Sequence, residues 1–190
     1  MRLFVSLNPD ENSLKQIREV QTELKNRIMN VNKDFIHKIR WEKSDKFHIT
    51  LFFIGDTDND KYLLINEALH ETESSSRIGE INFSFNTINA FPNLRYPRVL
   101  ILELTNADKA VYELSDKINF SFSGMGIKSD KKFHPHITLG RVKRDCKLNL
   151  TEIKKELKFK YEFSVSDFYL MKSELKAFGS EYEIKKKYKI

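Results

Sequence analysis

The sequence predicts one domain of mixed helices and strands, built from two similar lobes. Its length of 190 residues is typical of a single domain, and 40% hydrophobic residues are enough for a substantial core. Strand-like and helix-like segments follow one another in the same order in each half. The tetrapeptide His-Ile-Thr-Leu occurs at 48–51 and again at 136–139, separated by close to half the chain. A repeat of this spacing indicates an internal duplication.

In the first half, the apolar residues 2–7 predict a strand. Pro9 and Asp10 are typical of a helix start and predict a helix that runs to about residue 29, with its apolar residues on one face. The half continues with a strand at 47–54 closed by Gly55, a helix capped by Asp58 or Asp60, a Ser-rich loop at 74–76 and an alternating strand at 81–88.

The second half repeats this order. Residues 98–104 are almost continuously apolar and predict a buried strand, and a helix with apolar residues at helical spacing starts at Asn106 or Asp108. The remaining predictions are a Gly-Met-Gly turn, a strand at 134–142, a short helix with a capping box formed by Asn149 and Glu152, and two strands at about 161–171 and 181–190.

Composition excludes several classes of protein. The single cysteine, Cys146, rules out an intrachain disulfide framework and a multi-cysteine metal site. No uninterrupted apolar run approaches the roughly 18 residues needed to cross a bilayer. The apolar stretch at the N-terminus is too short for a signal peptide and is better interpreted as a strand. We therefore expect a soluble, cytoplasmic protein without membrane contact.

The net charge of +6 is concentrated in the last third of the chain. Residues 128–190 contain 17 Lys or Arg against 9 Asp or Glu, whereas the rest of the chain is slightly acidic. A basic segment attracts phosphate at long range and favours an anionic partner such as a nucleic acid or a nucleotide. The alternative is a solvated lysine-rich surface, which is the usual role of runs such as Lys185-Lys186-Lys187.

Both His-x-Thr triplets lie in predicted strands at matching places in the two halves. Because side chains alternate across a strand, His48 and Thr50 point to one face while their apolar neighbours point to the other. His136 and Thr138 have the same arrangement. If the apolar faces pack beneath helices and the lobes face one another, two imidazoles and two hydroxyls line one groove.

These groups fit the hydrolysis of a phosphodiester. In-line attack by water needs one proton removed and one delivered, and a neutral and a protonated imidazole supply that pair near neutral pH. Threonine hydroxyls can donate hydrogen bonds to the non-bridging oxygens of the phosphate. No carboxylate cluster or Cys/His ligand set accompanies the pair, so the sequence does not suggest metal catalysis.

The other histidines are interpreted separately. A histidine taken alone is more often a structural or surface residue than a catalytic one, and His37 and His70 keep that interpretation. His134 shares a strand face with His136 and is a candidate for lining the groove.

The sequence resembles the two-histidine (2H) phosphoesterase superfamily, whose signature is a pair of His-x-Thr-x motifs. Within it, the chain is similar to the bacterial and archaeal RNA 2′,3′-cyclic phosphodiesterases, historically called 2′–5′ RNA ligases. The resemblance extends over nearly the whole chain. It is carried by RLFVSLNPDE at the start, RWEKSDKFHITLFFIGD around the first motif, AFPNLRYPRVLILEL in the middle, FHPHITLGRVK around the second motif and LMKSELKAFGSEYE near the end.

The resemblance implies an α+β, bilobal, pseudo-two-fold fold, with two antiparallel sheets around a central groove and helices outside. It implies hydrolysis of 2′,3′-cyclic phosphate ends of RNA, or of nucleotides, to 2′-phosphomonoesters without metal or cofactor. By position, His48 resembles the proton donor to the departing 3′-oxygen and His136 resembles the proton acceptor that activates water. Thr50, Thr138 and Arg141 resemble residues that bind the phosphate.

Further side chains match family positions without an assigned role. Arg98 is a candidate for lining the groove, and Arg40 is a weaker one, because an arginine beside a strand also serves as a salt-bridge or packing residue. Trp41 and Phe91 could stack on a base, although aromatic residues beside a strand more often belong to the core.

Two other functions stay open at this point. The same groove could bind a nucleotide or an RNA end without hydrolysing it, although both motifs are intact here. The enzyme could instead act as a 2′–5′ phosphodiesterase or run in reverse as a 2′–5′ RNA ligase, which microscopic reversibility allows. We expect a monomer, because each lobe covers the sheet of the other.

Overall fold

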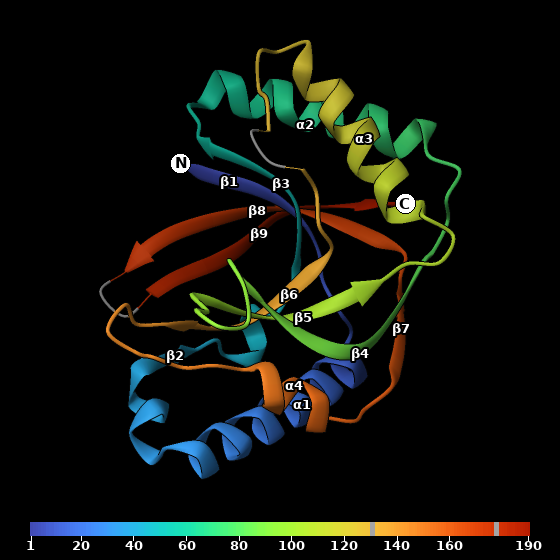
Figure 1. The fold of residues 1–190 in the computed structure, drawn as a ribbon. Helices are drawn as coiled ribbons and strands as arrows, with labels where there is room; N and C mark the ends of the chain where they lie inside the picture. Colours follow the sequence, from blue (N-terminus) through green and yellow to red (C-terminus); the bar gives the residue numbers. More distant parts are fainter. Residues whose placement is uncertain (130–131, 177–178) are drawn as a thin grey trace.

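The structure is a computed structural model that describes residues 1–129, 132–176 and 179–190. Figure 1 shows two curved layers of strands in the middle, with pairs of helices on the two outer sides. The strands are β1 (Arg2–Leu7), β2 (Ile39–Trp41), β3 (Ile49–Asp56), β4 (Ile81–Phe91), β5 (Val99–Thr105), β6 (His136–Val142), β7 (Tyr161–Val165), β8 (Asp167–Lys176) and β9 (Gly179–Lys189). The helices are α1 (Glu11–Val31), α2 (Asn59–Ser75), α3 (Ala110–Ser123) and α4 (Thr151–Glu156), with 3₁₀ turns at Lys33–Lys38 and Ser44–Lys46.

The strands form two antiparallel sheets. Sheet A has the order β3-β1-β8-β9, and sheet B has the order β2-β6-β5-β4-β7. Helix α3 contacts β3 and helix α2 contacts β9, so this pair covers sheet A, whereas α1 and α4 contact β7 and β4 of sheet B. The predicted α+β fold with two antiparallel sheets and outer helices is therefore confirmed.

The two sheets do not coincide with the two halves of the sequence. Strands β8 and β9 from the second half complete sheet A, and β4 from the first half lies inside sheet B. The helices exchange in the same way, because α3 covers sheet A and α1 covers sheet B. The two predicted lobes are thus interlocked, and each hydrophobic layer is built from both halves of the chain.

The single strand predicted at 161–171 is two strands, β7 and β8, in different sheets. The buried positions change parity between them. Phe163 and Val165 are buried in β7, whereas Phe168 and Leu170 are buried in β8. A strand with period 2 cannot bury both sets on one face, so the chain crosses from sheet B to sheet A at Ser166.

The helix starts are set by side chains that accept hydrogen bonds from free backbone N–H groups. Asp10 and Asp58, rather than Asp60, are the caps of α1 and α2. The helix predicted to start at Asn106 or Asp108 begins later, at Ala110. Both side chains still cap it, because they accept hydrogen bonds from N–H groups of its first turn.

The other boundaries differ by a few residues. Helix α2 extends into the predicted Ser-rich loop and ends at Ser75. Leu150 rather than Asn149 is the N-cap residue of α4, although the Asn149 side chain still accepts from the N–H of Thr151 at 2.9 Å. Strand β2 and the two 3₁₀ turns were not predicted from the sequence. None of the helices in the described ranges is both long and apolar enough to cross a membrane.

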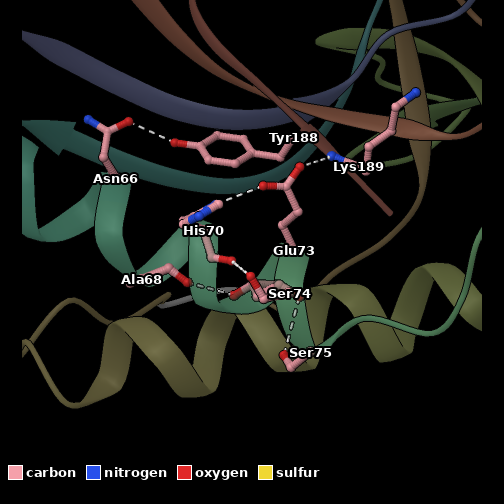
Figure 2. Close-up of polar contacts among 9 residues, drawn as sticks. Asn66, Ala68, His70, Glu73, Ser74, Ser75, Tyr188 and Lys189 are labelled. Atoms are coloured by element: carbon pink, nitrogen blue, oxygen red, sulfur yellow. Dashed lines mark hydrogen bonds and ion pairs between the residues drawn. The ribbon is translucent and has the colours of Figure 1, made fainter.

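Polar contacts fasten α2 to the last strand of sheet A (Figure 2). The Tyr188 hydroxyl donates to Oδ1 of Asn66 at 2.7 Å, and the Lys189 N–H donates to the Glu73 carboxylate at 2.7 Å. Glu73 also contacts the His70 ring at 2.8 Å. The Tyr188 ring is buried and stacks on Phe168 with a centroid separation of 5.0 Å. The hydroxyl therefore supplies a hydrogen bond inside an otherwise apolar contact.

Tyr188→Phe should lower the free energy of unfolding by about 1 kcal/mol, because it removes this hydrogen bond and leaves the Asn66 oxygen without its donor. For a chain of this length the melting temperature should fall by about 3 °C. Thermal denaturation followed by circular dichroism measures the change. The matched control is Tyr96→Phe, whose ring is 70% exposed and which should melt like the parent protein. Equal melting of all three proteins would contradict the assignment.

Candidate active site

A cavity of about 300 Å³, here called the histidine cavity, is bordered by both sheets. Five of the residues predicted from the sequence lie in it, namely His48, Thr50, His136, Thr138 and Arg141. Three of them belong to β6 of sheet B. His48 and Thr50 belong to β3 of sheet A or directly precede it. The two motifs, almost half a chain apart, therefore face the same space.

The apolar residues of both motifs point away from the cavity, as predicted. Ile49, Leu51, Ile137 and Leu139 are all at most 4% exposed. Each motif leucine is also an extra residue in its strand. In each strand, the motif threonine and the residue after the leucine pair with two consecutive residues of the neighbouring strand. The leucine between them has no partner of its own, so the strand bulges there.

The bulges decide which later residues reach the cavity. With strict alternation, the residue five places after the motif histidine would lie on the opposite face. After one bulged residue it lies on the cavity face instead. That residue is Phe53 in β3 and Arg141 in β6, and both line the histidine cavity. Arg141 thus owes its position beside the motif to a local irregularity of the strand.

Both motif histidines are anchored through Nδ1. His48 Nδ1 lies 2.7 Å from the carbonyl oxygen of Lys46, and His136 Nδ1 lies 2.7 Å from that of His134. A carbonyl oxygen can only accept, so Nδ1 carries the proton in each ring. Nε2 is then the atom that exchanges protons. Nε2 of His48 is 3.0 Å from the hydroxyl of Thr50, and Nε2 of His136 has no hydrogen-bond partner among the described residues.

Burial and neighbouring charge lower the pKa of both rings. Desolvation is the main cause of a His48 pKa of about 4, and the nearby His136 and Arg141 lower it further. The pKa of His136 is also lowered, mainly by burial and then by His134 and Arg141. At neutral pH both rings are therefore neutral, and Nε2 is unprotonated in each.

Aromatic rings pack against each histidine. The His48 ring packs against Phe4 and Tyr182, with centroid separations of 5.0 and 5.2 Å, and these two rings also contact each other. Phe91 contacts His136 edge to face at 5.2 Å. These contacts hold the imidazoles in place and exclude water from one side of each ring. Phe91, a candidate for stacking on a base, is thus already engaged with His136.

Arg141 is held by an acidic neighbour. Its Nε atom lies 3.5 Å from the carboxylate of Glu42, which follows β2. The Arg141 side chain is 48% exposed, so its guanidinium remains open to an incoming anion. Glu42 is the one acidic side chain among the described residues that line the histidine cavity, where the basic residues are Arg2, Lys46 and Arg141.

The two further candidates for lining the groove, Arg98 and His134, lie in different places. Arg98 lines neither the histidine cavity nor the neighbouring one, as the described residues form them, and its guanidinium donates to the carbonyl of Lys143. The expectation that Arg98 lines the groove is therefore corrected. His134 lines an adjoining cavity of about 720 Å³, which shares His136 and Arg141 with the histidine cavity, and lies 3.6 Å from Glu103, so it borders the groove as predicted. Arg40 and Trp41 border a third, smaller cavity beside Glu42.

Most of the residues that line the histidine cavity were not predicted from the sequence. The residues not predicted are Arg2, Phe4, Glu42, Lys46, Phe53, Ser173, Ser180 and Tyr182. They come from β1, β3, β8, β9 and the segment before β3, whose pairing in sheet A is not encoded by any local motif. The basic last third contributes less than its charge indicated, because many of its lysines form ion pairs with Asp167, Glu174 and Glu183.

No group of three or more His, Cys, Asp or Glu side chains within the described ranges is arranged to hold a metal ion. The polar groups that line the histidine cavity are chiefly imidazoles, hydroxyls and guanidinium groups. Two neutral imidazoles with unprotonated Nε2, two threonine hydroxyls and Arg141 can together bind an anion and exchange protons with it.

Comparison with proteins of known structure gives the same fold. The chain aligns with TT0787 of Thermus thermophilus at a TM-score of 0.81 and 23% identity, covering 100% of this chain and 97% of that one. It aligns with Escherichia coli LigT in a complex with 3′-AMP at a TM-score of 0.68 and 20% identity, again covering 100% and 97%. Both comparisons support the two-sheet architecture.

Sequence comparison extends the relationship beyond the fold. An RNA 2′,3′-cyclic phosphodiesterase of Archaeoglobus fulgidus is 30% identical over 96% of this chain and 97% of its own length. A protein of the same name from Methanocaldococcus jannaschii is 28% identical over 99% of this chain and all of its own length. The family described as the 2′-5′ RNA ligase superfamily matches residues 9–177. The chain belongs to the 2′-5′ RNA ligase superfamily.

Proposed function

We propose that the protein is an RNA 2′,3′-cyclic phosphodiesterase, which opens the cyclic phosphate at an RNA end or on a nucleotide to give a 2′-phosphomonoester. The observation that carries the proposal is the pairing of His48 and His136 in one cavity, each with Nδ1 anchored and Nε2 left for proton exchange. The names of the relatives support the same reaction class.

In the proposed reaction, the cyclic phosphate lies between the two imidazoles. Nε2 of His136 accepts a proton from a water molecule, whose oxygen forms a new bond to phosphorus. The bond from phosphorus to the 3′-oxygen breaks, and Nε2–H of His48 donates the proton that the departing oxygen needs. The 2′-oxygen keeps its bond, which makes the 2′-phosphomonoester the product.

Thr50, Thr138 and Arg141 stabilise the transferring phosphate in this proposal. The hydroxyls donate to its non-bridging oxygens, and the guanidinium offsets the charge that builds up on them. The Thr50 hydroxyl now donates to Nε2 of His48 at 3.0 Å. It turns to the phosphate when His48 becomes protonated, because a protonated Nε2 no longer accepts.

Binding of the anionic substrate also favours protonation of His48, the proposed general acid. Burial holds the pKa of His48 at about 4, so this ring is neutral at neutral pH before the substrate binds. A phosphodiester bound between the rings brings negative charge to within contact distance and raises the pKa. Proton uptake therefore accompanies substrate binding, and the acid is formed where it is needed.

The product identifies the reaction. A nucleoside 2′,3′-cyclic phosphate incubated with the protein should give a 2′-phosphate resonance in a phosphorus NMR spectrum, and turnover should persist in a chelator because no metal enters the proposed steps. A 3′-phosphate product, or binding without turnover in a calorimeter, would contradict the proposal and favour the binding-module alternative. Accumulation of 2′–5′-linked product from RNA with a 5′-hydroxyl would favour the ligase alternative.

We also infer that the protein works as a cytoplasmic monomer in RNA processing. The inference is supported by an RNA-type substrate, a single buried cysteine, and an arrangement in which the two sheets border their shared cavity within one chain.

A further inference from the structure

Arg2, at the start of β1, is a cation of the histidine cavity that forms no hydrogen bond or ion pair within the described part of the chain. It lines the cavity together with Phe4. Its guanidinium makes no hydrogen bond or ion pair with the described residues, and its Nε atom is buried without a partner. Asp56 is its cross-strand neighbour on β3, yet the two side chains form no ion pair. A half-buried guanidinium that forms no ion pair with the carboxylate across the strand is available to a bound anion.

Phe53 holds the Arg2 side chain in this position. The guanidinium carbon of Arg2 lies 5.2 Å from the centroid of the Phe53 ring, which is a cation–π contact. Phe53 takes the place in β3 that Arg141 takes in β6, five residues after the motif histidine and beyond the same leucine bulge. Through its contact with Phe53, Arg2 of β1 places a guanidinium beside the first motif strand, whereas Arg141 is part of the second motif strand itself.

Strand β1 places Arg2 on the same face as the residue that packs against His48. On β1, Phe4 packs against the His48 ring with centroids 5.0 Å apart. Arg2 is the next residue on the same strand face, about 6.6 Å further along β1. Its ladder partner on β8 is Ser173, which also lines the cavity. Arg2 therefore lines the part of the cavity that is bordered by β1 and β8, next on its strand face to the residue that packs against His48.

We propose that Arg2 binds the phosphodiester that joins the terminal nucleotide to the rest of an RNA strand. This phosphodiester is the next negative charge along the strand after the cyclic phosphate, and a free nucleoside 2′,3′-cyclic phosphate does not have it. Arg2 is then a specificity-determining residue, which makes the site prefer RNA ends to mononucleotides. The inference rests on the proposed function, because it takes the cyclic phosphate to lie between His48 and His136.

The experiment is a double-mutant cycle in which one change is made in the protein, at Arg2, and the other in the substrate, at the internal phosphodiester. One substrate is a dinucleotide that ends in a 2′,3′-cyclic phosphate, and the other is the same dinucleotide with an uncharged methylphosphonate linkage. For the parent protein, kcat/KM should be about tenfold lower with the methylphosphonate, because a charge-assisted hydrogen bond is lost. Arg2→Ala should lose about tenfold on the normal dinucleotide and nothing more on the methylphosphonate. Additive losses would overturn the proposal.

Two readouts separate this role from a structural one. With a nucleoside 2′,3′-cyclic phosphate, Arg2→Ala should stay within about twofold of the parent protein, and an equal loss on both substrate types would overturn the proposal. The slope of log KM against log salt concentration for the dinucleotide should weaken by about 0.7, the value for one phosphate contact with a single strand. Arg2→Lys should keep most of the salt slope, and Arg98→Ala, outside the cavity, should leave every value unchanged.

Failure of the proposed function would be visible separately. It would appear as absence of turnover by the parent protein with the nucleoside 2′,3′-cyclic phosphate. The cycle can then be run by calorimetric binding of two dinucleotides that end in a 2′-phosphate, one with the normal and one with the methylphosphonate linkage. Coupling between Arg2 and the internal charge would support the role of Arg2 even then, and additivity would overturn it.

Discussion

Replacing His136 with alanine should lower kcat for cyclic phosphate opening by about 10³-fold while the fold stays intact. General base catalysis typically contributes a factor of this size. The ring is held by one hydrogen bond to the backbone of His134 and by edge contacts with aromatic rings, so its removal leaves no buried charge. His48→Ala should cost a similar factor. The measurement is single-turnover kinetics, with circular dichroism as the test of folding.

The two variants should respond differently to the leaving group. A phosphodiester substrate with a nitrophenolate leaving group needs no proton at that oxygen, so His48→Ala should regain most of its activity on it. His136→Ala should not, because water still has to be deprotonated. His37→Ala is the matched control, since this histidine is exposed on the Lys33–Lys38 turn and should retain full activity. Recovery of both variants, or of His136→Ala alone, would refute the assigned roles.

The repeat made this part of the site predictable from sequence. His48, Thr50, His136 and Thr138 are recognisable because two identical tetrapeptides lie at matching places in a repeated order of elements. Alternation along a strand then places each His and Thr on one face. Arg141 was predicted only through the family resemblance. Simple alternation would have put it on the wrong face, because the bulge at Leu139 is not visible in the sequence.

The rest of the cavity depends on pairing between distant strands. Tyr182 reaches His48 only because β9 joins β8, which joins β1 in sheet A. Arg2 reaches the cavity through the same sheet. No local pattern states which strands become neighbours, and the duplication pointed to separate lobes rather than to the exchange of strands that the fold contains. The change of buried parity between Val165 and Phe168 was a usable signal for that exchange.

The pH dependence of kcat/KM should have its maximum on the acid side of pH 6.5. For the free enzyme, this parameter follows the fraction in which His48 is protonated and His136 is neutral. The pKa of His48 is about 4 and that of His136 is below its ordinary value. Above both values the active fraction falls about tenfold per pH unit, so kcat/KM should drop by about 100-fold between pH 6.5 and 8.5. The alkaline limb of kcat should lie at higher pH, because bound phosphate raises the pKa of His48.

Arg141→Gln tests whether the charge of Arg141 lowers the pKa of the two histidines. The positive charge of Arg141 lowers the pKa of both histidines, so its removal should move the alkaline limb of kcat/KM to higher pH even though the rate itself falls. Arg141→Lys keeps the charge and should keep the limb in place, which separates the electrostatic effect from the loss of phosphate contacts. Profiles from pH 4 to 9 at constant ionic strength measure both. A maximum above pH 7.5, or a limb that does not move in Arg141→Gln, would show that burial and Arg141 do not control protonation of the pair.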